Sequence, residues 1–251
     1  TLDEQGKEKY RSLSTELSLL NLEFNQNALK DKNKFEYLIT NEADLAGLPE
    51  SVREAAATLA REKEKEGWLF NLSSPSYVPF MRYADNRALR EMMYKEFLSV
   101  ANKGDEFDNK EVIRKIVNIR LEIARLMGNS NFAEYRLQQA MAKNQENVYK
   151  LLNDLLEAYK PVAETEYKAV SDFAGGLSVM PWDWNYYAEK LKDSKFSVND
   201  EMTRPYFEVG NVTNAIFGLA TKLYGITFKE NKEIAVYHPE VTAYEVYDED
   251  G

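Results

Sequence analysis

Residues 108–128, DNKEVIRKIVNIRLEIARLMG, carry the clearest helical signal in the chain. Asp108 followed three residues later by Glu111 has the pattern of a capping box, in which the two side chains satisfy free amides at a helix start. The apolar residues that follow recur every three or four positions, and Gly128 is typical of a helix end. The stretch predicts an amphipathic helix with one buried face, and it places the chain among the mainly helical proteins.

Similar periodicity predicts helices over most of the remaining sequence. Asn144 is expected to begin a long helix that Pro161 kinks or interrupts and that Gly175 and Gly176 end. Gly225 is expected to close the last helix. The other predicted helices cover residues 10–25, 49–66, 86–102, 132–141, 184–192 and 212–224.

After Gly225 the apolar pattern changes to a period of two, which is typical of strands. Residues 226–228, 234–236 and 244–246 show it and predict a small sheet. The chain then ends at residues 248–251, DEDG, which is a hairpin-turn signal with no strand after it. We therefore expect that the partner strand lies outside this sequence.

Composition limits the possible functions. The 251 residues include 32 basic and 42 acidic side chains, and the resulting charge of −10 argues against a nucleic-acid-binding surface. No cysteine is present, so disulfides, thiol nucleophiles and cysteine-held metals are excluded. No apolar run is long enough to span a membrane. We expect a soluble protein, either cytoplasmic or periplasmic.

Motifs for catalysis are missing from the sequence. It contains no glycine-rich phosphate loop, no G-x-S-x-G and no H-E-x-x-H, and its one histidine, His238, precedes a proline. A lone histidine in such a position is more often a hydrogen-bonded structural residue than a metal ligand or a general base. Many acidic pairs exist, but none can be chosen as a catalytic dyad without geometry.

The most distinctive segment runs from Val179 to Leu191, because it combines Pro-Trp-Asp with two adjacent tyrosines. Asp183 is a natural N-cap at this point. The aromatic side chains favour a cap and core cluster over a ligand-stacking site, since aromatic rings bury large apolar areas.

At this point the sequence resembles a known family. Four blocks occur in the same order as in the central region of the thimet oligopeptidase (M3) family of zinc peptidases. Upstream segments at residues 45–49, 85–91, 108–111 and 141–143 also look like that family, and most like its bacterial peptidyl-dipeptidase (dipeptidyl carboxypeptidase) branch. The four blocks are Pro181-Trp182-Asp183 with Tyr186-Tyr187, Arg204-Pro205-Tyr206-Phe207, residues 223–228, and residues 237–251.

The resemblance implies a mainly α, two-lobed protein with a deep channel. In the family, two histidines of H-E-x-x-H and a later glutamate hold zinc, which activates water. No such ligand can be transferred to this chain, so we expect no catalytic or metal residue here and no bound zinc. Residues 1–225 would form a helical channel wall, and residues 226–251 would begin an antiparallel sheet leading into an absent catalytic segment. The residues expected to support the channel wall or the active site are Trp182, Asp183, Tyr187, Tyr206, Phe207, His238 and Tyr244.

The leading hypothesis is therefore an inactive fragment of a zinc-dependent peptidyl-dipeptidase, whose parent removes C-terminal dipeptides from short unfolded peptides. An endo-acting oligopeptidase of the same family is the first alternative, and a non-enzymatic helical binding or scaffold module is the second. The expected partners are peptides and the missing catalytic segment of the same chain. Apolar surface left open by that segment should favour self-association.

Overall fold

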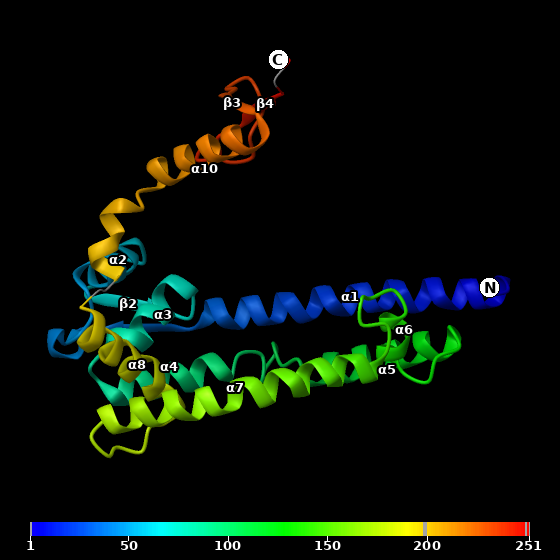
Figure 1. Cartoon of the computed structure of the whole chain (residues 1–251), viewed down its shortest axis with the longest axis horizontal. Coiled ribbons are helices and arrows are strands. Elements are labelled where there is room, and N and C mark those ends of the chain that lie inside the picture. The colour runs from blue at the N-terminus through cyan, green and yellow to red at the C-terminus, as the bar shows by residue number, and fades with distance from the viewer. Residues whose placement is uncertain (1, 198–199, 249, 251) are drawn as a thin grey trace. The chain divides into compact units, whose positions relative to one another are not determined.

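The computed structural model describes residues 2–197, 200–248 and 250, and it is mainly helical, as predicted (Figure 1). The chain divides into two compact units, Thr1–Ser194 and Lys195–Gly251, which are treated separately below. The expected functional boundary at residue 225 stays a prediction.

The first unit holds most of the helices and one strand pair. Its elements are α1 (Glu4–Lys34), β1 (Glu36–Ile39), the 3-10 helix η1 (Glu42–Leu45), α2 (Glu50–Glu62), β2 (Trp68–Asn71), α3 (Ser74–Tyr83), α4 (Arg87–Leu98), α5 (Lys110–Leu126), α6 (Phe132–Leu137), α7 (Gln145–Phe173) and α8 (Pro181–Phe196), whose last two residues fall in the second unit.

The predicted helix at residues 108–128 is α5, and its apolar face packs along α1 (Figure 1). The capping-box prediction is wrong, because the Glu111 side chain accepts hydrogen bonds from Arg114 at 2.8 and 2.9 Å. Asp108 instead accepts from the amides of Lys110 and Gly104 just before the helix. The buried residues of this α1–α5 core are Leu13, Leu20, Val112, Ile116, Ile119 and Ile123.

A second core lies around an antiparallel strand pair that the sequence did not reveal. Strands β1 and β2 pair from Glu36 opposite Asn71 to Ile39 opposite Trp68. Gly67 is required next to this pair, since its φ is +123° and a Cβ there would lie 2.4 Å from the Ile39 carbonyl oxygen. The buried residues of this second core are Ile39, Leu45, Leu48, Ala56, Phe70, Leu72, Phe80, Met81, Ala84 and Met93.

The long helix predicted after Asn144 is α7, and the Asn144 side chain caps it by accepting from the Asn147 amide. Pro161 was expected to kink or interrupt this helix. The interruption is wrong, because α7 continues through that residue to Phe173, whereas the kink stays a prediction. The expected end is confirmed, since Gly175 and Gly176 both have positive φ.

The described part of the second unit contains one longer helix, two short helical segments and a strand pair. Its elements are α9 (Asp200–Thr203), the 3-10 helix η2 (Arg204–Tyr206), α10 (Val209–Tyr224), β3 (Thr227–Glu230) and β4 (Tyr244–Tyr247). Gly225 closes α10 with φ +74°, as predicted.

Strands β3 and β4 pair antiparallel, from Thr227 opposite Tyr247 to Glu230 opposite Tyr244. The predicted strand at 234–236 is wrong, since these residues form a bend and irregular chain. The turn signal at 248–251 includes two positions outside the described residues, 249 and 251, so the further strand expected after it stays a prediction.

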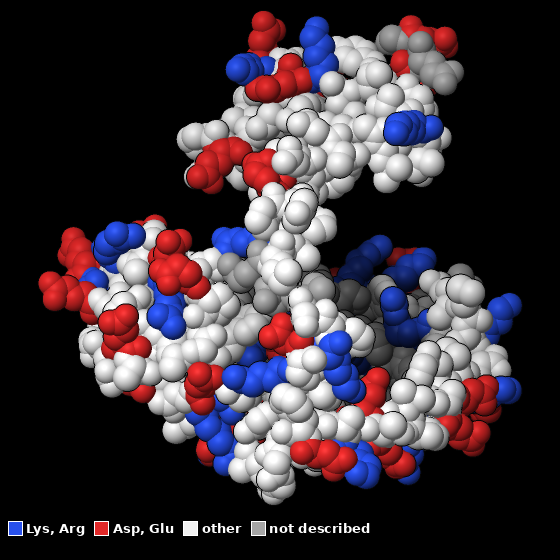
Figure 2. Space-filling model, turned by 60° about the vertical axis from the view of Figure 1, so that its left-hand side comes forward, with Lys and Arg blue, Asp and Glu red and all other residues white. Residues whose placement is uncertain are grey.

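Basic and acidic side chains are interspersed over the face shown in Figure 2. Among the described helices, none combines the length and the apolar content that a membrane crossing requires.

Candidate functional site

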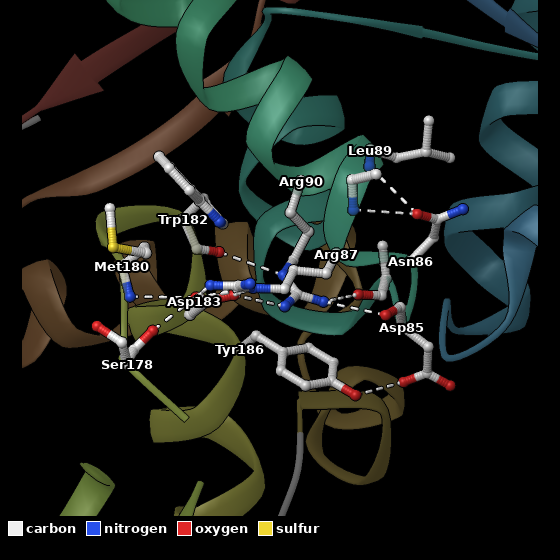
Figure 3. Close-up of polar contacts among 12 residues, drawn as sticks. Asp85, Asn86, Arg87, Leu89, Arg90, Ser178, Met180, Trp182, Asp183 and Tyr186 are labelled. Carbon is white, nitrogen blue, oxygen red and sulfur yellow. Dashed lines mark hydrogen bonds and ion pairs between the residues drawn. The ribbon is translucent and has the colours of Figure 1, made fainter. Parts of the chain in front are cut away.

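A polar cluster with buried charged side chains joins the start of α4 to the start of α8 in the first unit (Figure 3). Asp183 lies at its centre with a side chain that is 0% exposed. Arg87 donates to both carboxylate oxygens, with Nη2 2.7 Å from Oδ2 and Nε 3.0 Å from Oδ1. Arg90 donates from Nη2 to Oδ1 at 2.9 Å. Charge-assisted hydrogen bonds of this kind are about twice as strong as neutral ones.

Asp183 is the third residue of α8, so its predicted role as the N-cap is wrong. Its carboxylate reaches back to accept from the Met180 amide at 3.1 Å, as an acidic residue at this helix position does in a capping box. Burial alone would raise the Asp183 pKa, but the hydrogen bonds from Arg87, Met180 and Arg90 outweigh it and lower the pKa. The carboxylate therefore stays ionised, and both of its oxygens accept hydrogen bonds.

The Arg90 side chain is only 1% exposed, and like Asp183 it forms several hydrogen bonds. Its Nη1 donates to the carbonyl oxygens of Ala84 at 2.7 Å and Asp85 at 3.2 Å, and its Nε donates to the Trp182 carbonyl at 3.2 Å. The guanidinium also lies 3.9 Å from the centre of the Tyr186 ring. Arg90 thus links the end of α3, the turn before α4 and the first turn of α8.

Tyr186 extends the cluster to the surface. Its hydroxyl donates to Asp85 Oδ1 at 2.7 Å, and Lys190 Nζ lies 3.3 Å from the same oxygen. The Tyr186 hydrogen bond is the main cause of a lowered Asp85 pKa, while burial and that same contact raise the pKa of Tyr186. The phenol consequently stays protonated and holds Asp85 in place.

The arrangement fixes the start of α8 against α4. The Asp183 oxygens accept hydrogen bonds from two arginines and one amide. Their lone pairs are therefore not free to attack a substrate or to bind a metal ion. A carboxylate paired in this way fixes the helix that carries it. We call the set Asp85, Arg87, Arg90, Asp183 and Tyr186 the α4–α8 clamp.

The structure places the other predicted site residues of α8 beside this clamp. The Trp182 ring packs against the second core and lies 6.0 Å from the ring of Tyr94, and its indole N–H is buried with no hydrogen-bond partner among the described residues. The Tyr187 ring meets Tyr186 edge-on at 5.1 Å. The interpretation of this segment as a cap and core cluster is consistent with these contacts.

Four predicted site residues belong to the second unit. Tyr244 packs edge-on against Phe217 at 4.9 Å, whereas Tyr206 and Phe207 have largely exposed side chains. His238 is half-exposed, and its Nδ1 accepts from the Glu240 amide at 3.3 Å, so it makes the local hydrogen bond expected of a structural histidine. A role of all seven residues in a channel wall stays a prediction.

Sequence reasoning missed Arg87 and Arg90, which supply the positive charges of the clamp. Both lie on α4, three residues apart, and therefore on neighbouring positions of one helix face. Two arginines on one helix face, just after the Asn86 cap, could have indicated a site for a buried acidic residue. That residue could not be identified locally, because it lies more than 90 positions later in the chain.

The fold and this cluster define a mainly helical protein with a structural ionic clamp. Residues 80–251 match the model of peptidase family M3, and the chain belongs to that family. This confirms the resemblance deduced from the sequence.

Two curated relatives illustrate the similarity. Oligopeptidase A of Salmonella typhimurium is 39% identical over 256 residues, which cover 99% of this chain and 38% of that protein. Dipeptidyl carboxypeptidase of Escherichia coli is 34% identical over 257 residues, which cover 100% of this chain and 38% of that protein. The chain therefore spans about 38% of the length of these relatives.

Family M3 comprises zinc metallopeptidases, and the described residues do not fit a zinc site. No group of three or more histidine, cysteine, aspartate or glutamate side chains is arranged to hold a metal ion in the part of the chain that the structure describes. The single histidine has an acidic neighbour in Glu240, whose Oε2 lies 3.9 Å from His238 Nδ1. Zinc needs three or four protein donors at about 2 Å.

Proposed function

We propose that this chain forms the helical wall of a longer zinc-dependent peptidase that hydrolyses short unfolded peptides. The observation that carries the proposal is the family match over residues 80–251, together with relatives that are much longer than the chain. Since the described residues offer no zinc donor set, the catalytic centre would lie in the remainder of the longer protein. The chain alone would then be inactive.

The geometry supports a wall rather than a reaction centre. The α4–α8 clamp fixes α8 through fully paired buried charges. The long helix α7 carries ion pairs on one side, Lys150 with Asp154 and Lys168 with Asp172, and exposed apolar residues on the other. An amphipathic helix normally buries its apolar side against another part of the protein. In the proposal that part belongs to the remainder of the parent protein.

For the mode of cleavage, we propose the removal of C-terminal dipeptides, on the upstream segments at residues 45–49, 85–91, 108–111 and 141–143, which look most like the peptidyl-dipeptidase branch. Endo-acting cleavage is the second candidate. The observation in its favour is the identity of 39% to an oligopeptidase A, against 34% to a dipeptidyl carboxypeptidase.

Product analysis with the intact parent protein tests the proposal. A peptide of about ten residues is supplied with a free C-terminus and, separately, with an amidated one, and the products are identified by mass spectrometry. A peptidyl-dipeptidase should release dipeptides from the free form and lose most of its rate on the amide, because its site recognises the terminal carboxylate. Equal internal cleavage of both peptides would establish the endo-acting mode instead.

The metal requirement and the scaffold alternative are tested on the same preparations. The parent should contain one zinc ion per molecule and lose activity in a chelator, and the 251-residue chain should show neither zinc nor hydrolysis. A parent with no H-E-x-x-H in its sequence and no peptidase activity would instead favour the hypothesis of a non-enzymatic scaffold. Stoichiometric zinc and dipeptide release by the chain itself would place the active site inside it.

A further inference from the structure

Helix α10 has apolar residues on more than one side. One side packs on the strand pair of its own unit, where Phe217 stacks on Phe228 at 4.1 Å and meets Tyr244 edge-on. Another side carries four large apolar residues at helical spacing that all point to solvent. They are Val209, Ile216, Leu219 and Leu223, exposed by 78%, 58%, 57% and 63%, and we call them the open face of α10.

The described residues of the second unit form no buried apolar core. None of its described residues is a buried hydrophobic residue, and α10 contains no buried residue at all. A helix that is apolar on most sides is normally surrounded by protein. A piece of this size gains too little from burial to offset the entropy of ordering its backbone. Its fold therefore needs a covering element.

The chemistry of the open face points to protein rather than to a membrane surface. Helix α10 has one charged side chain, Lys222, and an interfacial membrane helix would carry a strongly basic polar face. Much of the surface of this unit in Figure 2 is uncharged. A face of this kind fits the apolar stripe of another helix or sheet.

We infer that the open face of α10 is the docking surface for the remainder of the parent polypeptide, and that the second unit is ordered only when this face is covered. The inference rests on the proposed function, in which the chain is part of a longer protein. The relatives supply the argument for the occupant, because this chain spans only 38% of their length. A segment of the same polypeptide also docks without the entropic cost of bringing two molecules together.

Hydrogen exchange read by mass spectrometry tests this inference without reference to catalysis. The amides of α10 and of strands β3 and β4 should exchange at least 100-fold more slowly in the full-length parent than in the 251-residue chain, because burial raises the free energy of local opening. The amides of α5, which packs on α1, provide the internal control and should exchange alike in both. Equally slow exchange of α10 in the chain alone would overturn the inference.

A matched pair of variants in the full-length parent locates the surface. Leu219→Asp puts a charge into the open face and should increase exchange across α10 by at least tenfold. Asn214→Asp lies on another side of the same helix and should leave it unchanged. Equal effects of both variants, or none, would contradict docking at this face.

Two further outcomes are decisive. Protection of α10 in the full-length parent that grows with protein concentration would make a second copy the occupant and would overturn the inference. A parent that lacks peptidase activity but protects α10 would refute the proposed function while leaving the docking surface established.

Discussion

Asp183 shows how one buried charge fixes the position of a helix. It is completely buried, and it is stable there because two arginines and the Met180 amide donate to it. Arg90 is buried with it, so neither charge has access to water. Removing one member of a buried pair costs more than the pair contributes, because the other charge is left desolvated and unpaired.

Asp183→Asn should therefore lower the free energy of unfolding by about 3–5 kcal/mol, since the buried Arg90 loses its counter-charge. Urea unfolding at neutral pH measures the change. Asp172→Asn is the matched control, because Asp172 pairs with Lys168 on the surface of α7 and should change stability by less than about 1 kcal/mol. Similar losses in the two variants would show that the clamp contributes no special stability.

The pH dependence of this difference has a definite sign. The Asp183 pKa is lowered in the folded state, so its contribution is complete above the ordinary aspartate pKa of about 3.9 and is lost as the pH falls through the lowered value. The stability gap between the wild type and Asp183→Asn should therefore narrow on acidification from neutral pH to below 3.9. A gap that widens in acid would contradict this assignment.

Tyr186 combines two roles that substitution can separate. Tyr186→Phe keeps the ring under Arg90 but loses the hydrogen bond to Asp85, and it should cost about 1 kcal/mol. It should also return the Asp85 pKa towards its ordinary value, which NMR titration can follow. Tyr187→Phe serves as the control, because the edge-on ring contact remains, and it should leave the Asp85 pKa unaltered.

At the scale of elements, helices α5 and α7 of the first unit differ in how many of their residues are buried by packing. Helix α5 buries Val112, Ile116 and Ile123 against α1. Helix α7 is nearly as long as α1, yet Val170 is its only buried residue within the described part of the chain. Its stability depends more on local propensity and on the ion pairs along its charged side than on packing.

Pro161 is therefore expected to be a weak point of α7. Pro161→Ala supplies an amide donor for the preceding turn and removes a ring clash, so it should stabilise the protein by about 1–3 kcal/mol. Thermal unfolding measures this gain. Lys160→Ala, one residue earlier, should change stability by less than about 0.5 kcal/mol, and an equal effect of the two substitutions would assign the gain to general helix propensity.

At the scale of the whole molecule, the notable feature is the amount of apolar surface that faces solvent. Large exposed side chains occur on α7 at Leu151, Leu152 and Leu156 and on α10 along its open face. Contiguous apolar patches on a stable monomer are normally limited to a few hundred Å². Surface of this kind is typical of a region that another part of the protein covers.

The 251-residue chain should therefore self-associate when it is purified alone. Sedimentation velocity should show a concentration-dependent rise in mass, because apolar association gains about 25 cal/mol per Å² buried. In our proposal the full-length parent covers these faces, so it should sediment as a species of constant mass over the same range. A clean monomer of the chain at high concentration would count against covered faces.

Local chemistry accounts for what could be predicted from the sequence. The periodicity of residues 108–128 located α5 to within two residues at each end, and Gly225 was correctly assigned as the end of α10. These signals depend on residues three or four positions apart, so they need no knowledge of the fold. The ordered blocks identified the family, which residues 80–251 confirm.

Interactions between distant residues could not be read in this way. Helix α3 was missed because Pro79 in its interior argues against a helix locally, and the β1–β2 pair was missed because its strands are far apart in the sequence. The outer two strands predicted after Gly225 are present as β3 and β4, whereas the register of their pairing depends on contacts made across a long irregular loop.

The sequence by itself determined the helical class, the family and the absence of a complete set of zinc ligands of the H-E-x-x-H type. Only the tertiary structure decided that Asp183 is the buried partner of two arginines rather than an N-cap, and that α10 presents an uncovered apolar face. The physical reason is that caps and periodicity act over a few bonds along the chain. Ion pairing and burial depend on which distant surfaces meet when the chain folds.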